Sequence, residues 1–233
     1  MALAGALGTG VLALRNGAVV PAFSAEKKGE EAGGEEVSAT EDLMREHGVL
    51  RRTLDVYAEL SRRLENHNGD IDPAALADTA ELFHNFGEDY HERMLEEVYI
   101  FPELRKSGGA NERLVDVLLR QHIRGREITD YLYRIGSRGN IGGDAQPLAK
   151  ALASMSRMYN AHSAWEDTVV FPAWKAMNSK ARLDELSDKF EDIEHKMFGK
   201  DGFEDAVQRV SRIEQALGMG NLDYFTAPAP PPA

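Results

Sequence analysis

The sequence predicts an all-α protein: an antiparallel, up-down-up-down four-helix bundle with two extra C-terminal helices and disordered termini. Four long stretches, joined by short linkers, place apolar residues at every third or fourth position, which is the period of an amphipathic helix. No stretch of the 233 residues shows the period of two that indicates a β-strand. Long helices with short linkers are expected to pack antiparallel to their neighbours.

The first two helices begin at recognisable caps. Ser38-Ala39-Thr40-Glu41 is a capping-box pattern and predicts a helix that runs to about Asn66. Asp72-Pro73 provides an N-cap residue and a proline at the first helical position, which predicts a second helix to about Lys106. Ser107 and the two glycines after it end that helix.

The remaining helices follow from the same periodicity. A third helix is expected over about 112–135 and a fourth over about 145–177, with a glycine-rich turn between them. Two shorter helical segments, about 181–197 and 203–217, should pack on the outside of the bundle. The final residues, 227–233, are rich in proline and alanine and should be extended or disordered.

This organisation predicts four parts: 1–37 as an export-signal remnant with a flexible linker, 38–178 as the bundle, 179–226 as a helical extension, and 227–233 as the tail. Residues 1–25 are apolar, and Ala22-Phe23-Ser24 fits a signal-peptidase site, but the only charge is Arg15. Two interpretations stay open. Either the segment is the rear of an export signal, which implies a periplasmic or exported protein, or it is a disordered extension of a cytoplasmic one.

Composition narrows the function. The formal net charge of −12 argues against nucleic-acid binding, which depends on a cationic surface. No run of about 18 apolar residues predicts a membrane span. The absence of cysteine excludes disulfides, thiolate metal sites and cysteine nucleophiles. A metal ion would therefore be held by nitrogen and oxygen ligands, which favours iron, manganese or zinc.

An internal repeat divides the bundle into two helical hairpins. Residues 90–104 resemble residues 161–174, because each has a histidine, then an acidic pair, then an apolar run into Phe-Pro. Glu96 and Glu166 correspond at an offset of 70, and His47 and His122 lie 75 residues apart. Each hairpin is therefore expected to carry a lone histidine on its first helix and a histidine with a glutamate on its second.

Six of these ionisable residues are candidate metal ligands, because histidines and a glutamate fall on helical stripes where packing alone would favour leucine. Four imidazoles and two carboxylates from four helices can surround a cation cluster, whose positive charge offsets the negative charge of the carboxylates. No catalytic residue is assigned. The candidates are His47, His91, Glu96, His122, His162 and Glu166.

The two histidine–glutamate pairs differ in spacing. His162 and Glu166 are four residues apart and share a helix face. His91 and Glu96 are five apart, which rotates the second side chain by about 140° in an ideal α-helix. A one-residue π-bulge would restore the alignment. The repeat favours Glu96 as the first-half carboxylate, while Glu92 and Glu97 remain alternatives.

Other residues receive plainer interpretations. His84 is expected near the surface or outside the first ligand shell, and His67 and His195 are expected to be structural or exposed. Glu46 is expected to be solvated. Gly48 and Gly125, next to or near candidate histidines, are expected to leave room for a diatomic ligand.

With these residues the chain resembles the bacterial hemerythrin-like proteins, the hemerythrin HHE cation-binding domain family, over about 40–175. The motifs that carry the resemblance are Glu46-His47-Gly48, Tyr90-His91 through Phe101-Pro102, Gln121-His122, and His162 through Phe171-Pro172. The resemblance implies two iron ions with an oxo or hydroxo bridge, terminal histidines and bridging Glu96 and Glu166. Zinc or manganese are conceivable substitutes for iron.

The chain departs from the oxygen-carrying members of that family at one ligand position. Those members have a His-x3-His pair on the third helix, whereas His122 is followed at this spacing by Arg126. One coordination position should therefore be open or filled by water, tyrosine or glutamate.

The leading hypothesis is a non-heme di-iron protein that binds O₂ or a related small oxidant, in oxygen or NO binding, iron handling or oxidative-stress defence. The alternatives are a di-iron enzyme acting on peroxide or NO, and a metal-free helical interaction module. The expected partner is a small diatomic or peroxide ligand. The oligomeric state stays open.

Overall fold

A computed structural model of the protein describes residues 37–66 and 71–231, and in these ranges all regular secondary structure is helical. The all-α class is therefore confirmed. The expected export-signal remnant at 1–37 lies almost wholly outside the described residues, as do His67 and the last two residues of the tail.

The first half of the chain contains two long helical segments. α1 spans Ala39–Asn66, and the Ser38 hydroxyl accepts a hydrogen bond from the backbone N–H of Glu41 at 3.4 Å. The second segment is continuous and consists of α2 (Pro73–Leu82), the π-helix η1 (Phe83–Ile100) and α3 (Phe101–Lys106). Asp72 caps it by accepting from the N–H of Ala74 at 2.9 Å. Both predicted caps are therefore present.

The second half repeats this pattern and adds the extension. α4 spans Gly109–Gly136, and after the short helix η2 (Gly142–Asp144) come α5 (Ala145–Trp165), the π-helix η3 (Glu166–Val170) and α6 (Phe171–Met177). α7 (Lys180–Phe198), α8 (Gly202–Ala216) and the short η4 (Leu222–Phe225) complete the described chain. The helix ends predicted from the sequence agree with these bounds to within three residues.

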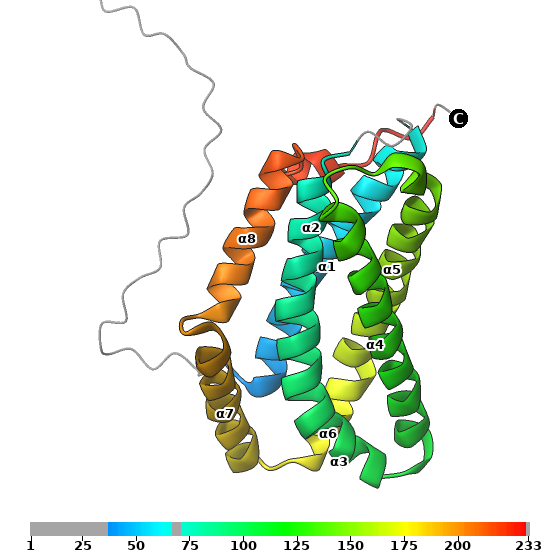
Figure 1. Cartoon of the computed structure of the whole chain (residues 1–233). Coiled ribbons are helices and arrows are strands. Elements are labelled where there is room, and N and C mark those ends of the chain that lie inside the picture. The colour runs from blue at the N-terminus through cyan, green and yellow to red at the C-terminus, as the bar shows by residue number, and fades with distance from the viewer. Residues whose placement is uncertain (1–36, 67–70, 232–233) are drawn as a thin grey trace, which may run out of the picture. The chain divides into compact units, whose positions relative to one another are not determined.

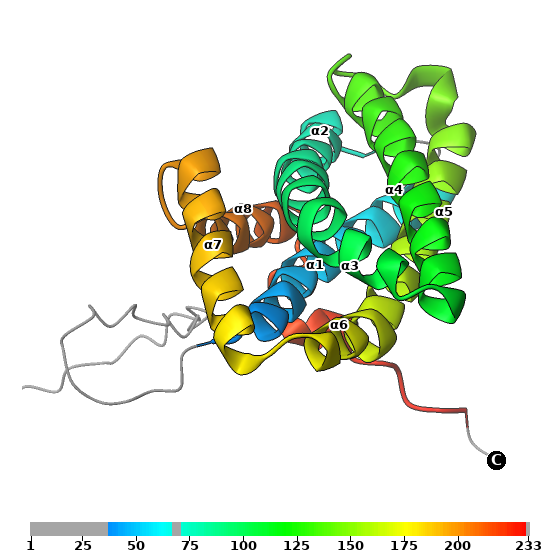
Figure 2. The same ribbon diagram turned by 90° about the horizontal axis from the view of Figure 1, so that it is seen from below.

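The helices pack around a core of buried leucine and aromatic side chains. α1 lies beside α5 along much of its length, α2 lies against α4, and α4 also contacts α5 (Figure 1). α7 and α8 lie on the outer side of α1 and of the α2–η1 segment, as the view along the helices shows (Figure 2). The two extra helices thus cover one flank of the part that carries the candidate ligands.

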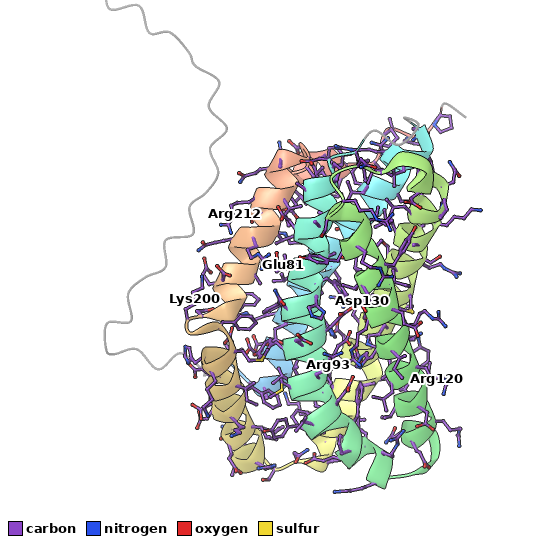
Figure 3. All side chains as sticks on the ribbon, viewed as in Figure 1. Glu81, Arg93, Arg120, Asp130, Lys200 and Arg212 are labelled. Carbon is purple, nitrogen blue, oxygen red and sulfur yellow. The ribbon has the colours of Figure 1, made fainter. Side chains whose placement is uncertain are left out.

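The outer faces of the helices carry many charged side chains, among a few exposed apolar ones such as Ile123 and Trp165. Charged side chains such as Arg120 and Arg212 extend away from the ribbon (Figure 3). Within the described residues, no helix is both long and apolar enough to cross a membrane.

Two π-helices of different length, η1 with 18 residues and η3 with five, end at matching places. The backbone N–H of Phe101 bonds to the carbonyl of Glu96, and that of Phe171 bonds to the carbonyl of Glu166. Both bonds span five residues, which is the π-helical pattern. A proline follows each phenylalanine, and because proline has no N–H to donate it is compatible with the return to α-helical bonding. The repeat in the sequence is therefore also a repeat in backbone geometry.

Candidate metal centre

The six predicted ligands lie together in the interior. α1 contributes His47, η1 contributes His91 and Glu96, α4 contributes His122, and α5 with η3 contributes His162 and Glu166. Each of the six is at most 4% exposed. Four helical segments therefore converge on one buried cluster, and the predicted set meets at a single place.

The four imidazoles form two pairs that face each other through their Nε2 atoms. The Nε2 atoms of His47 and His91 are 3.0 Å apart, and those of His122 and His162 are 3.1 Å apart. A phenylalanine ring stacks on one member of each pair: Phe171 on His47 and Phe101 on His122, both with ring centroids 5.4 Å apart. The two halves of the site are thus built alike.

The two carboxylates lie between the imidazole pairs. Oε1 of Glu96 is 3.4 Å from Nε2 of His91, and its Oε2 is 3.4 Å from Nε2 of His122. Glu166 does the same from the other side: Oε2 is 3.4 Å from Nε2 of His47, and Oε1 is 3.0 Å from Nε2 of His162. Each carboxylate therefore reaches both pairs.

The hydrogen bonding of these carboxylates indicates a cation site. None of the four oxygens of Glu96 and Glu166 has a hydrogen-bond partner among the described residues, although all four are buried. A buried carboxylate without partners is costly. Nε2 and carboxylate oxygen are donors that iron, manganese and zinc accept. Among the described residues, three sets of side chains have ligand atoms within 4.8 Å of one another: Glu96, His122, His162 and Glu166; His47, His91 and Glu96; and Glu92, Glu97 and His122. The first two sets contain all six predicted ligands. The residues present therefore fit metal ions.

The electrostatics agree with this interpretation. Burial disfavours the charged form of His122, but the nearby carboxylates of Glu92, Glu96 and Glu97 outweigh it and raise its pKa to about 10. Burial and the neighbouring Glu166 would raise the pKa of Glu96, yet the facing histidines hold it below its usual value. The cluster thus favours anionic carboxylates and requires positive charge beside them.

η1 is π-helical over all 18 residues from Phe83 to Ile100, rather than at a single one-residue bulge. Its wider turn brings Glu96 back to the face that carries His91, five residues earlier, and places it beside the Nε2 atoms of both histidine pairs. Glu92 and Glu97 lie outside the histidine pairs. Glu92 accepts a hydrogen bond from the Tyr159 hydroxyl at 2.7 Å, and Glu97 accepts from Nδ1 of His122 at 2.9 Å.

Each of the four histidines has a side-chain hydrogen-bond acceptor at Nδ1, whereas its Nε2 faces the cluster. The acceptors are Asp167 for His47 (2.7 Å), Glu46 for His91 (2.5 Å), Glu97 for His122 (2.9 Å) and Gln121 for His162 (2.9 Å). Because an N–H at Nδ1 leaves the lone pair on Nε2, these contacts aim the Nε2 lone pairs inward, as partners behind metal-binding histidines do.

These acceptors repeat with the halves of the chain, a regularity that the sequence analysis missed. Glu46 and Gln121 each precede a lone histidine, and Glu97 and Asp167 each follow an inner glutamate. The acidic pairs 96–97 and 166–167 were visible in the repeat, so the second acid of each pair could have been found. Solvation of Glu46 was a wrong expectation: it is 2% exposed and also accepts from the Tyr90 hydroxyl at 3.0 Å.

Replacement of Glu46 by alanine should weaken metal binding, because His91 loses the acceptor that orients its ring. We expect the dissociation constant for the metal to rise by about 10- to 100-fold, the usual effect of removing such a partner. Competition with a chromophoric chelator measures it. Glu41→Ala, exposed on the same helix, should leave the constant unchanged, and an unchanged constant in Glu46→Ala would contradict the role given to Glu46.

Arg126, which stands where oxygen carriers have a histidine, lies outside the histidine pairs. Its Nη2 donates to Glu97 and, at 3.0 Å, to Glu92. It therefore neutralises two carboxylates next to His122. His84 pairs with Glu88 with 41% of its side chain exposed, and His195 is exposed. Both histidines lie apart from the cluster, as the sequence indicated.

The two glycines near the histidines do not leave space for a ligand, contrary to expectation. Gly48 is exposed, and a Cβ there would have no neighbour within 4 Å. At Gly125 the space is filled by Tyr159, whose ring carbons Cε2 and Cζ would lie 2.7 Å from a Cβ. Gly125 therefore admits the tyrosine whose hydroxyl bonds to Glu92.

Replacement of Gly125 by alanine should lower the free energy of unfolding by about 1–2 kcal/mol, because displacing Tyr159 outweighs the helix propensity of alanine. Gly48→Ala, also in a helix, should instead raise it by up to about 1 kcal/mol. Urea titration of both variants measures the difference. Equal shifts in the two variants would contradict the packing described for Tyr159.

A small cavity adjoins the cluster. Its volume is about 10 Å³, close to the minimum that holds one water molecule. Leu50 and Leu54 form an apolar wall, and the full lining is His47, Leu50, Arg51, Leu54, His91, Glu92, Tyr159, His162 and Ser163.

Comparison with known proteins gives a consistent result. The family model for the hemerythrin HHE cation binding domain matches residues 38–132. Uncharacterized proteins from Mycobacterium bovis and Mycobacterium tuberculosis are 42% identical over 194 residues, which is 82% of this chain and 74% of theirs. No solved structure matches the chain significantly. The matched family, the relatives and the buried histidine–glutamate cluster together show that the chain belongs to the hemerythrin HHE cation-binding domain family.

Proposed function

We propose that the protein binds two iron ions and, through them, a small oxidant such as O₂, NO or peroxide. His47 and His91 would hold one ion, His122 and His162 the other, and Glu96 and Glu166 would bridge them. The observation that carries this proposal is the set of four buried carboxylate oxygens without hydrogen-bond partners, placed between two pairs of Nε2 atoms.

The proposed architecture is the up-down-up-down bundle of the hemerythrin type. Its four members would be α1, the α2–η1–α3 segment, α4 and the α5–η3–α6 segment, because each contributes ligands to the cluster. Such bundles place cofactors between facing helices. α7 and α8 would be an addition that covers one flank.

Bound iron would supply a redox-active cation that binds small oxidants. The residues of this chain would shield it from water and orient its histidine ligands. Phe101 and Phe171 stack on histidines, and Leu50 and Leu54 line the adjoining cavity, so water has little access. The four acceptors at Nδ1 would keep a proton on that nitrogen of each ring, and a metal ion at Nε2 would take the place of any proton held there. The cavity is close to the minimum size that holds one water molecule, which favours a very small ligand.

The test is metal analysis followed by ligand titration. Protein loaded anaerobically with Fe(II) should contain two irons per chain, and addition of NO should change its optical spectrum in a saturable manner. Zinc-loaded protein is the matched control, because zinc fills the same ligands without redox chemistry. Absence of stoichiometric iron, or an iron-loaded protein that does not respond to O₂, NO or peroxide, would contradict the proposal.

A further inference from the structure

Arg51 is the most exposed of the residues that line the cavity beside the cluster. Of the nine residues that line it, eight are buried, whereas Arg51 is half-buried with 37% of its side chain exposed. The Arg51 side chain is therefore the part of the cavity lining that solvent reaches most.

Arg51 is held across this position by contacts to the opposite helical segment. From α1, its Nη2 donates to Asp167 of η3, and its Nε donates to the Ser163 hydroxyl of α5 at 3.3 Å. Asp167 in turn accepts from Nδ1 of His47 at 2.7 Å. The guanidinium thus spans α1 and the α5–η3 segment at the edge of the cavity.

These contacts are of a kind that opens readily. Partly exposed ion pairs contribute little stability, about 0–1 kcal/mol, because water competes for both charges. The arginine side chain is long and keeps its charge when it swings into solvent. Opening at Arg51 therefore requires no movement of a helix.

We propose that Arg51 determines which ligands reach the metal centre, by closing the cavity to larger molecules and by gating the entry of small ones. This inference rests on the proposed function, since it requires metal in the cluster. A ligand enters when the guanidinium leaves Asp167 and Ser163, and is enclosed when those contacts form again.

The neighbouring residue offers a matched control. Arg52 has 35% of its side chain exposed and also pairs with an acid and a serine, but it reaches Glu214 and Ser211 of α8. It does not line the cavity. Arg51→Ala and Arg52→Ala thus each remove one arginine with two side-chain partners, and only the first opens the cavity.

The experiment uses the iron-loaded full chain in wild type, Arg51→Ala, Arg51→Lys and Arg52→Ala. Azide is the small probe and imidazole the larger one, and stopped-flow absorbance measures their association and dissociation rates. Iron content and thermal midpoint are determined for each protein. Arg51→Lys keeps a charge near Asp167, so it remains informative if Arg51→Ala fails to fold.

A gate changes both rates together. We expect the association and dissociation rates of azide to rise by on the order of tenfold in Arg51→Ala, with the dissociation constant nearly unchanged, because ΔG of binding depends only on their ratio. The association rate of imidazole should rise more than that of azide, by a further factor on the order of ten, because the larger probe is hindered more by the closed side chain. Arg51→Lys should fall between these values, and Arg52→Ala should match wild type.

Two results would overturn the gate while leaving the proposed function intact: azide rates in Arg51→Ala equal to those of Arg52→Ala, or a change confined to the dissociation rate, which would make Arg51 a ligand contact. A wild-type protein that takes up no iron would instead refute the proposed function. Rates that rise together, with unchanged iron content, support the gate.

Discussion

Replacement of Glu166 by alanine should remove both metal ions from the protein rather than one. The two oxygens of this carboxylate face different histidine pairs, at 3.4 Å from Nε2 of His47 and 3.0 Å from Nε2 of His162. Its loss therefore removes one ligand from each proposed ion. It also leaves the four buried histidines with one carboxylate instead of two to offset the positive charge of the metal ions. Metal content per chain after dialysis is the measurement.

Two further variants sharpen this prediction. His162→Ala removes a group that faces only one ion, so it should reduce metal content less than Glu166→Ala does. Glu185 is an exposed glutamate on α7, and the Glu185→Ala variant should retain both ions. If Glu166→Ala kept one of two ions at full occupancy, the carboxylate would not bridge the two histidine pairs.

Removal of metal should lower the thermal midpoint strongly, because the metal-free cluster contains four buried carboxylate oxygens without partners. Each metal ion present at 1,000 times its dissociation constant adds about 4 kcal/mol to the free energy of unfolding. For a chain of this size each ion therefore corresponds to roughly 8–16 °C. Calorimetry of chelator-treated and reloaded protein measures the shift.

The control for this shift is the double variant Glu96→Gln with Glu166→Gln. Its uncharged amides cannot neutralise a bound cation, so this variant should bind metal far more weakly than the wild type. Added metal should leave its midpoint unchanged. A wild-type midpoint that does not respond to metal would contradict the energetic role assigned to the cluster.

Helix positions were predictable because their signals are local. Ser38 and Asp72 mark two starts through side-chain caps, and the glycines after Ser107 mark an end, so each boundary depends on a few neighbouring residues. The choice of Glu96 over Glu92 and Glu97 depended on the repeat, because periodicity alone assumes an α-helix and places Glu96 on another face. The π-helical turn that reconciles the two lies in the hydrogen bonding of the backbone.

Contacts between helices were harder to foresee. Glu46 is one residue before His47 and so points about 100° away around α1. Periodicity assigns that direction to solvent, but η1 lies there and brings His91 and Tyr90 to its carboxylate. Arg51 resembles any exposed helical arginine until α5 and η3 are placed beside it. Such roles depend on which helices become neighbours, which the pattern of one helix does not specify.

The central claim is that two cations lie between the histidine pairs with Glu96 and Glu166 between them. Anomalous diffraction at the iron edge, from crystals of the iron-loaded protein, tests it directly. We expect two peaks on the order of 4 Å apart, one beside His47 and His91 and the other beside His122 and His162. A single peak, or iron bound at other residues such as His84, would contradict the claim.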